Sequence, residues 1–450
     1  MVKSNNYRLT RYLYPVDEVK YSLITSLLEK KNINECYYWT FELYYSNLED
    51  ELFELFYKIH YDFYAEHNPK LESFIKNKKK KWELEKEIIH IASIVKNIFI
   101  GSPTPTVFLM RQYICCLGYP SHIYKHNNNI MFGNIINFNS DYKNLCSAIC
   151  YGRLANIAYD INRLVKKDGA DVVHSIIIDY FETELCGICD GGREKINTLW
   201  KNREFTDDVH ILLAIVVHLM TDINKINFRP LFVIPTQDEI NEIILFENNI
   251  AVPIYKTLSI KRKYKTRNII GSFKLARDEL PDFINDNLLH WEYYAFGVPL
   301  WEKRVNSCFG NVDHNKREIC FPDNEDTYSS LEDLCEKFYK QYGYELDEQP
   351  SNIQSLSLHE IKPLCWKGWI CKLFGLKFYS ETEKNKNNIS NSELDIDLIV
   401  EQISHINISE INTYEVNIKE LSIYGNPDIY SELDINSIIN NIPNNYRFVY

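Results

Sequence analysis

The stretch CYYWTFELYYSNLEDELFELFYKIHYDF, residues 36–63, decides the fold of this chain, because aromatic side chains recur along it at helical spacing. The positions i, i+4, i+7 and i+11, which form one face of an α-helix, are held by Tyr37, Phe41, Tyr44 and Leu48. Trp39 and Tyr45 lie off this stripe, so the helices are expected to be apolar on more than one face. Such helices pack between neighbours, which favours stacked helical hairpins.

Helix signals continue on both sides of this stretch. Pro15, followed by Asp17 and Glu18, begins a helix that runs to about residue 30, because acidic side chains favour the positive end of the helix dipole. Further helices are expected at residues 34–45, 49–66, 82–98, 141–167, 170–185, 207–223, 280–304 and 330–342, with another ending at 116. Short connections between them imply antiparallel neighbours.

The middle of the chain has a different character. Residues 228–234 and 250–258 are short runs bounded by prolines, which are compatible with a small sheet and do not require one. The chain is therefore predicted to be mainly α-helical, with a solenoid-like N-terminal array of helical hairpins and a small β element in the middle. The expected parts are a helical-hairpin domain at 1–117, a second helical domain at 118–225, a mixed and mostly helical domain at 226–380, and an Asn-rich appendage at 381–450.

Composition narrows the class of protein. The 450 residues are 45% hydrophobic and 25% charged, as in a folded domain, and the net charge of −12 argues against a protein that coats nucleic acid. Residues 1–7 have no apolar core of signal-peptide length, and the longest apolar run, about 209–220, falls short of the roughly 20 residues of a membrane span. We expect a soluble, intracellular protein without a membrane contact, with its 12 cysteines reduced and mostly buried.

One cysteine pair has the spacing of a metal or redox motif. The thiolates of Cys186 and Cys189, in the order CxxC, can bind zinc or form a redox disulfide. A zinc site needs two more ligands, and no second CxxC or HxxxH follows; His174, His210 and His218 would reach the pair only through folding. The pair lies at the end of an expected helix, so we interpret it as a helix terminus and expect no cofactor, with the metal and redox roles as alternatives.

A basic segment follows the middle of the chain and consists of Lys261, Arg262, Lys263, Tyr264, Lys265, Thr266 and Arg267. Lysine and arginine side chains can neutralise phosphates, and a tyrosine ring such as that of Tyr264 can stack on a base. The candidate nucleic-acid contacts are therefore Lys261, Arg262, Lys263, Tyr264, Lys265 and Arg267. A nuclear-import signal, a contact with an acidic protein, and a solvated segment balanced by the nearby acids are the alternatives. Those acids are Asp278, Glu279, Asp282 and Asp286.

Other charged and motif-like stretches favour structural interpretations. The basic run at residues 78–81 is followed by Glu83, Glu85 and Glu87, which indicates a charge-paired solvent face of a helix. No glycine-rich phosphate loop, GxSxG, HExxH or EF-hand loop occurs in the sequence. No catalytic residue is therefore assigned, and the sequence favours a protein that is not an enzyme.

Three stretches together resemble a known group of proteins. Residues 12–46, which begin Tyr12-Leu13-Tyr14-Pro15, resemble uncharacterised proteins of giant nucleocytoplasmic DNA viruses, as do residues 289–295 and 342–349. The resemblance covers about a quarter of the chain and transfers no activity and no functional residue. It implies a viral protein that works in the cytoplasm of an infected cell or in the virus particle.

These observations predict a non-enzymatic helical scaffold or adaptor that binds other proteins. The resemblance implies that these partners are viral proteins. Helical arrays offer long binding surfaces, and Tyr and Trp are frequent interface anchors. The alternatives are a nucleic-acid-associated factor that uses residues 261–267, and a cryptic enzyme or zinc protein that uses Cys186 and Cys189. The sequence sets no oligomeric state.

Overall fold

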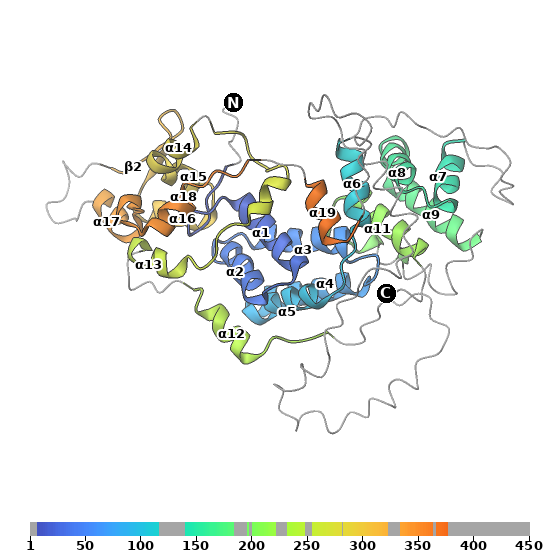
Figure 1. Ribbon diagram of the computed structural model, residues 1–450, viewed down its shortest axis with the longest axis horizontal. Helices are drawn as coiled ribbons and strands as arrows, with labels where there is room; N and C mark the ends of the chain where they lie inside the picture. The colour runs from blue at the N-terminus through green and yellow to red at the C-terminus, as the bar shows by residue number, and fades with distance from the viewer. Residues whose placement is uncertain are drawn as a thin grey trace, which may run out of the picture. The chain divides into compact units, whose positions relative to one another are not determined.

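The protein is mainly α-helical, as the computed structural model in Figure 1 shows, and this confirms the predicted fold class. The structure describes residues 7–116, 140–183, 196–197, 200–221, 232–247, 254–280, 282–322, 334–362 and 366–376. Within these residues the sheet content is one two-stranded antiparallel hairpin. No helix in the described part of the chain is both long enough and apolar enough to cross a membrane.

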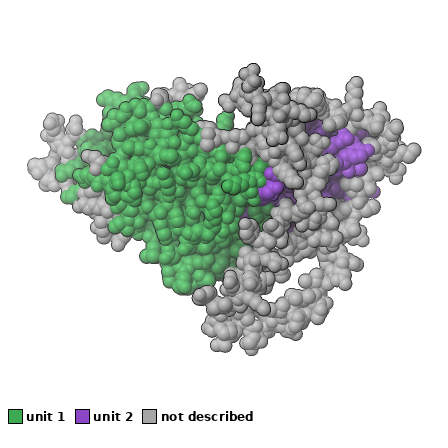
Figure 2. Space-filling model, in the orientation of Figure 1, with its two compact units in different colours: residues 1–60, 71–103, 229–373 green, residues 61–70, 104–228, 374–450 purple. Residues whose placement is uncertain are grey.

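The chain divides into two compact units, coloured separately in Figure 2. Unit 1 comprises residues 1–60, 71–103 and 229–373, and unit 2 comprises residues 61–70, 104–228 and 374–450. This grouping places residues 229–373 with the N-terminal helices, whereas the sequence had predicted a separate part at 226–380. The expected Asn-rich appendage lies outside the described residues.

The N-terminal helices follow the predicted pattern closely. They are α1 (Val16–Glu29), α2 (Ile33–Tyr44), α3 (Glu49–Phe63), α4 (Lys70–Glu85) and α5 (Ile88–Ile100). The single helix predicted at 82–98 is wrong, because the backbone turns at Lys86, whose φ of 56° is left-handed and ends α4. The expectation of helices that are apolar on several faces is confirmed for α2, in which every residue from 36 to 43 is buried.

The rest of unit 1 consists of short elements. In chain order they are α12 (Gln237–Ile244), α13 (Ile254–Lys261), the 3₁₀-helix η2 (Asn268–Ser272), α14 (Phe283–Leu289), α15 (Trp291–Phe296), α16 (Pro299–Ser307), β1 (Asn311–Asp313), β2 (Glu318–Cys320), α17 (Leu334–Tyr342), the 3₁₀-helix η3 (Leu346–Glu348), α18 (Ser351–Ser357) and α19 (Lys367–Leu373). The β element therefore lies at residues 311–320, with Asn311 opposite Cys320. The sheet considered at 250–258 is wrong where the structure describes it, because residues 254–258 belong to α13.

The helix predicted at 280–304 is divided into α14, α15 and α16. His290 ends α14 with φ −129° and ψ 20°, which is not helical, and Val298 is extended before Pro299. Proline disfavours a helical conformation in the residue before it, so Pro299 begins a new helix. The apolar periodicity of residues 280–304 therefore indicates which side chains are buried, but it does not indicate a continuous helix.

A buried ion pair holds the N-terminal segment in unit 1. Nε of Arg11 lies 2.8 Å from Oε2 of Glu42 on α2, and both side chains are 0% exposed. The other oxygen of Glu42 accepts the backbone N–H of Tyr12 at 3.1 Å. The Arg11 guanidinium lies 4.4 Å and 4.6 Å from the ring centroids of Tyr12 and Tyr45. The pair is therefore desolvated completely and depends on these hydrogen bonds and aromatic faces.

Replacing one member of this pair tests its role. We expect Arg11→Met to lower the free energy of unfolding by about 3–5 kcal/mol, because Glu42 would remain as a buried charge without its partner. The double variant Arg11→Met with Glu42→Leu removes both charges and should recover part of that loss. Urea unfolding followed by near-ultraviolet circular dichroism measures both, and a single variant as stable as the wild type would contradict the expectation.

Unit 2 is a group of helices that pack around α11. Its described helices are α6 (Thr106–Cys116), α7 (Ser140–Cys150), α8 (Leu154–Asp168), α9 (Ala170–Thr183) and α11 (Asp208–Met220). The apolar run at 209–220 is a buried core helix, as predicted, and it contacts α6, α8 and α9. The predicted helix at 141–167 is divided into α7 and α8 by Gly152, whose φ of 65° is left-handed.

A second buried cluster of charges lies in unit 2. The guanidinium of Arg111 donates to both carboxylate oxygens of Asp62, at 2.7 Å and 2.6 Å, and Nε2 of His210 lies 2.9 Å from Asp62. The imidazole is buried beside the rings of Tyr61 and Phe205, whose centroids are 5.8 Å and 5.4 Å away. Burial lowers the pKa of His210, and although Asp62 opposes this effect, Arg111 adds to it.

This lowered pKa predicts how stability changes with pH. A histidine in an unfolded chain has a pKa of about 6.5. Below that pH the unfolded state therefore takes up a proton that folded His210 does not. The contribution of His210 to stability is therefore full above about pH 6.5 and is lost as the pH falls toward its folded pKa. We expect His210→Gln to show a smaller loss of unfolding free energy between pH 7.5 and 5.5 than the wild type. A His210 resonance that titrates at or above 6.5 by NMR would contradict this.

Candidate functional site

The predicted basic segment, residues 261–267, begins at the last residue of α13 and ends before η2. Arg267 contacts the N-terminal helices of unit 1, because its guanidinium lies 3.0 Å from Glu29 on α1 and 2.8 Å from Glu35 on α2. Its backbone N–H also donates to the hydroxyl of Ser22 at 3.2 Å. The charge of Arg267 is therefore balanced within unit 1 by two carboxylates.

Arg262 and Tyr264 also contact other residues of unit 1. The buried guanidinium of Arg262 lies 4.0 Å from the ring centroid of Tyr14, and its Nη1 donates to Ser357 at 2.9 Å. The carbonyl of Tyr264 accepts the Tyr14 hydroxyl, and the Tyr264 ring meets the Tyr38 ring edge to face at 5.0 Å. Tyr264 thus already has an aromatic neighbour on the protein itself.

The three lysines of the segment differ in their contacts. Lys261 donates to the carbonyls of Leu245 and Glu247 at 2.7 Å and 3.1 Å. Lys263 lies 3.2 Å from Glu242 on α12, with both side chains more than two-fifths exposed, and Lys265 is exposed. The described carboxylates that pair with the segment are Glu29, Glu35 and Glu242, and not the acids at 278–286 that the sequence had suggested. Nucleic-acid contact, which would now depend on Lys263 and Lys265, stays a prediction.

These contacts separate a structural role from a binding role in the segment. We expect Arg267→Glu to lower the melting temperature clearly, because it would place a third carboxylate beside Glu29 and Glu35, whereas Lys265→Glu should leave it unchanged. Thermal unfolding of the two variants, which carry the same change of charge, measures the difference. Equal melting temperatures would show that the Arg267 ion pairs contribute nothing to stability.

Three exposed apolar side chains lie at the ends of the two helices that the segment joins through Lys261. We call this set the α12–α13 surface and define it by Ile244, Leu245 and Ile260, which are 48%, 63% and 78% exposed. The hydrogen bond from Lys261 to the Leu245 carbonyl joins the ends of α12 and α13. Sequence reasoning missed this surface, because apolar residues in short helices are normally read as core.

The helix under this surface is firmly held. A capping box between Thr236 and Glu239 begins α12, and Glu239 also accepts Lys96 of α5 at 2.7 Å. Ile243 and Phe246 are buried on the inner side, and the Phe246 ring meets Tyr38 at 5.4 Å. The exposed side chains of the α12–α13 surface are therefore carried by an anchored element.

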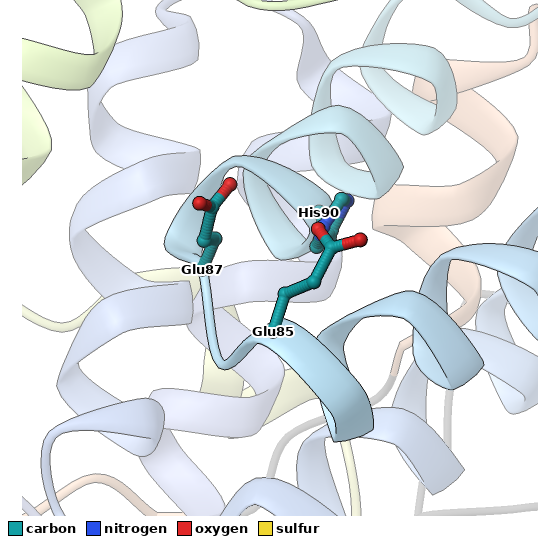
Figure 3. A group of neighbouring side chains, drawn as sticks. All are labelled: Glu85, Glu87 and His90. Carbon is teal, nitrogen blue, oxygen red and sulfur yellow. The ribbon is translucent and has the colours of Figure 1, made fainter.

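A separate group of possible ligands lies at the turn between α4 and α5, which Figure 3 shows in close-up. Glu85 is the last residue of α4, Glu87 is the N-cap of α5, and His90 lies in the first turn of α5. One ligand atom from each lies within 4.8 Å of the others, and Nε2 of His90 is 2.5 Å from Glu85. Glu85 and Glu87 were predicted to lie on a solvent face, and His90 was not singled out. The spacing ExExxH was the signal in the sequence that could have identified the group.

The predicted cysteine pair, Cys186 and Cys189, lies outside the described residues. The three histidines considered as its partners have other contacts. His174 stacks on Trp200, with centroids 4.5 Å apart, His210 lies beside Asp62, and Nδ1 of His218 lies 2.8 Å from the carbonyl oxygen of Glu66. The zinc alternative for the pair stays a prediction.

Comparison with known proteins identifies no relative from which a function could be proposed. No protein-family model, curated protein or solved structure matches the chain. The resemblance of residues 12–46, 289–295 and 342–349 to giant-virus proteins therefore stays a prediction. The α12–α13 surface and the cluster at the α4–α5 turn are the features on which functional proposals can be built.

Proposed function

We propose that the chain is a helical adaptor that binds another protein through the α12–α13 surface. The observation that carries the proposal is the exposure of Ile244, Leu245 and Ile260 on helices whose inner sides are anchored. Exposed apolar groups on ordered elements are typical of interaction sites. Full burial of such a side chain contributes about 1.5–3 kcal/mol, so three of them supply the centre of an interface.

The charges around the surface define the partner. Asp238 and Glu247 are exposed beside it, and neither takes part in an ion pair in the described part of the chain. Lys263 of the adjoining basic segment is balanced by Glu242. The proposed partner segment therefore carries apolar side chains next to lysine or arginine, which would face Asp238 and Glu247. Complementary charges of this kind increase the rate of association.

The setting of this adaptor is part of the proposal. The resemblance supports a soluble protein of a large DNA virus, with other viral proteins as partners, in the cytoplasm of the infected cell or in the virus particle. A role on RNA or DNA is the less favoured candidate, since Arg262, Tyr264 and Arg267 already have partners within unit 1.

Site-specific cross-linking tests the adaptor proposal. A photo-reactive amino acid at position 245 or 260, in cells that make the protein, should cross-link to a peptide that contains apolar residues beside lysine or arginine. Leu289 on α14 is the matched control position, because it is 67% exposed, close to the 63% of Leu245. Mass spectrometry of the cross-linked peptides identifies the partner segment.

A synthetic peptide of that segment then measures the interaction. We expect Leu245→Lys with Ile260→Lys to weaken its binding at least tenfold, and Asp238→Lys with Glu247→Lys to weaken it further at low salt, while Leu289→Lys has no effect. The adaptor proposal is rejected if position 289 captures the same peptides, or if the lysine variants at 245 and 260 bind as the wild type does.

A further inference from the structure

We propose that Glu85, Glu87 and His90 bind one divalent transition-metal ion at the turn between α4 and α5. An imidazole nitrogen and two carboxylate oxygens form a mixed donor set that suits zinc, manganese or iron. Three protein ligands leave at least one coordination position for water. This proposal is independent of the adaptor function, because it concerns different residues and a different surface.

The ligand atoms of the cluster can reach a metal-binding arrangement through side-chain rotation. A tetrahedral ion with bonds of about 2.0–2.1 Å holds its ligand atoms about 3.3 Å apart. The ligand atoms of the cluster lie within 4.8 Å of one another, and Figure 3 shows the Glu85 carboxylate directed toward His90. The side chain of Glu85 is half exposed and that of Glu87 is exposed, so small rotations can bring their oxygens closer.

The histidine supplies an observation that is independent of the acidic residues. His90 is 7% exposed, and among the described residues no group bonds to its buried Nδ1. The polar contact of its ring in the described structure is therefore the one between Nε2 and Glu85. Burial holds the ring with Nε2 toward Glu85, and an oxygen of Glu87 lies within 4.8 Å of the other ligand atoms, so the imidazole is positioned before an ion arrives.

The backbone brings the three ligands together. The left-handed Lys86 reverses the chain between the two glutamates, and its N–H donates to the carbonyl of Trp82 at 2.7 Å. The Lys86 ammonium lies 3.9 Å from the centroid of the Trp82 ring. No ion pair among the described residues joins this ammonium to either glutamate. Glu85 contacts His90 and interacts electrostatically with Lys78, and an added cation would replace the His90–Glu85 contact with bonds to both residues and to Glu87.

Cobalt binding to the full chain tests the site. The background variant Cys186→Ser with Cys189→Ser removes the predicted thiol ligands, so that Co²⁺ taken up by them does not obscure the result. On this background we expect one saturable Co²⁺ site without the intense sulfur-to-cobalt absorption of thiolate ligation. Glu85→Gln with Glu87→Gln should weaken the binding at least about tenfold, since even partners that only orient ligands have effects of that size.

Two controls make the outcome decisive. Glu83→Gln removes a neighbouring exposed carboxylate and should leave Co²⁺ affinity unchanged. Circular dichroism of the glutamine variants shows whether they fold, which is expected because both glutamates are exposed. Manganese should broaden the NMR signals of His90 before those of the other histidines. Absence of saturable binding, or equal affinity in Glu85→Gln with Glu87→Gln and in Glu83→Gln, would overturn the proposal.

Discussion

The buried ion pair between Arg11 and Glu42 is the interaction on which unit 1 depends. Taking both charges out of water is costly, and Nη1 and Nη2 of Arg11 have no hydrogen-bond partner among the described residues. The pair therefore relies on the contact of Nε with Glu42 and on the faces of Tyr12 and Tyr45. It holds the segment before α1 against α2, and the indole N–H of Trp301 on α16 donates to the carbonyl of Thr10 in the same segment at 3.0 Å. Residues near the start of the chain therefore share one core with α16, which agrees with the grouping of residues 229–373 with the N-terminal helices.

The same core explains the abundance of tyrosine. Arg262 lies on the ring of Tyr14, and Arg304 lies 4.4 Å and 4.8 Å from the rings of Trp301 and Tyr342. Burial lowers the pKa of Arg304 to about 10, which shows how far its charge is removed from water. A tyrosine ring accepts a buried guanidinium on its face while its hydroxyl reaches a polar partner. In the described part of the chain, the large apolar groups that remain exposed are mainly aliphatic, so many tyrosines expected as interface anchors belong to the core instead.

The sequence predicts helices that depend on the spacing of neighbouring residues, and it does not predict contacts between residues that are distant in the chain. Helices α1, α2, α3 and α11 follow from apolar spacing, because burial of a helical face leaves a periodic pattern. The breaks at Lys86 and Gly152 leave no comparable pattern, since one left-handed residue suffices for each. The carboxylate Glu29, which binds Arg267, is 238 residues away, whereas the acids nearest in sequence were expected to balance the segment. His90 escaped notice because ExExxH acquires meaning only when a turn brings its ends together.

Helix α5 connects the two proposed sites. His90 lies at its start, while Lys96 and Asn97 hold the segment around α12: Lys96 pairs with Glu239, and the Asn97 side chain both donates to and accepts from the backbone of Val233. Six residues separate His90 from Lys96, which is about 9 Å along a helix. An α-helix of this length moves as one rigid body. An ion bound at the α4–α5 turn would therefore act on α12 only by changing the position of the whole of α5. The proposed ion would therefore leave the composition and the apolar contacts of the α12–α13 surface unchanged, which keeps the two proposals independent.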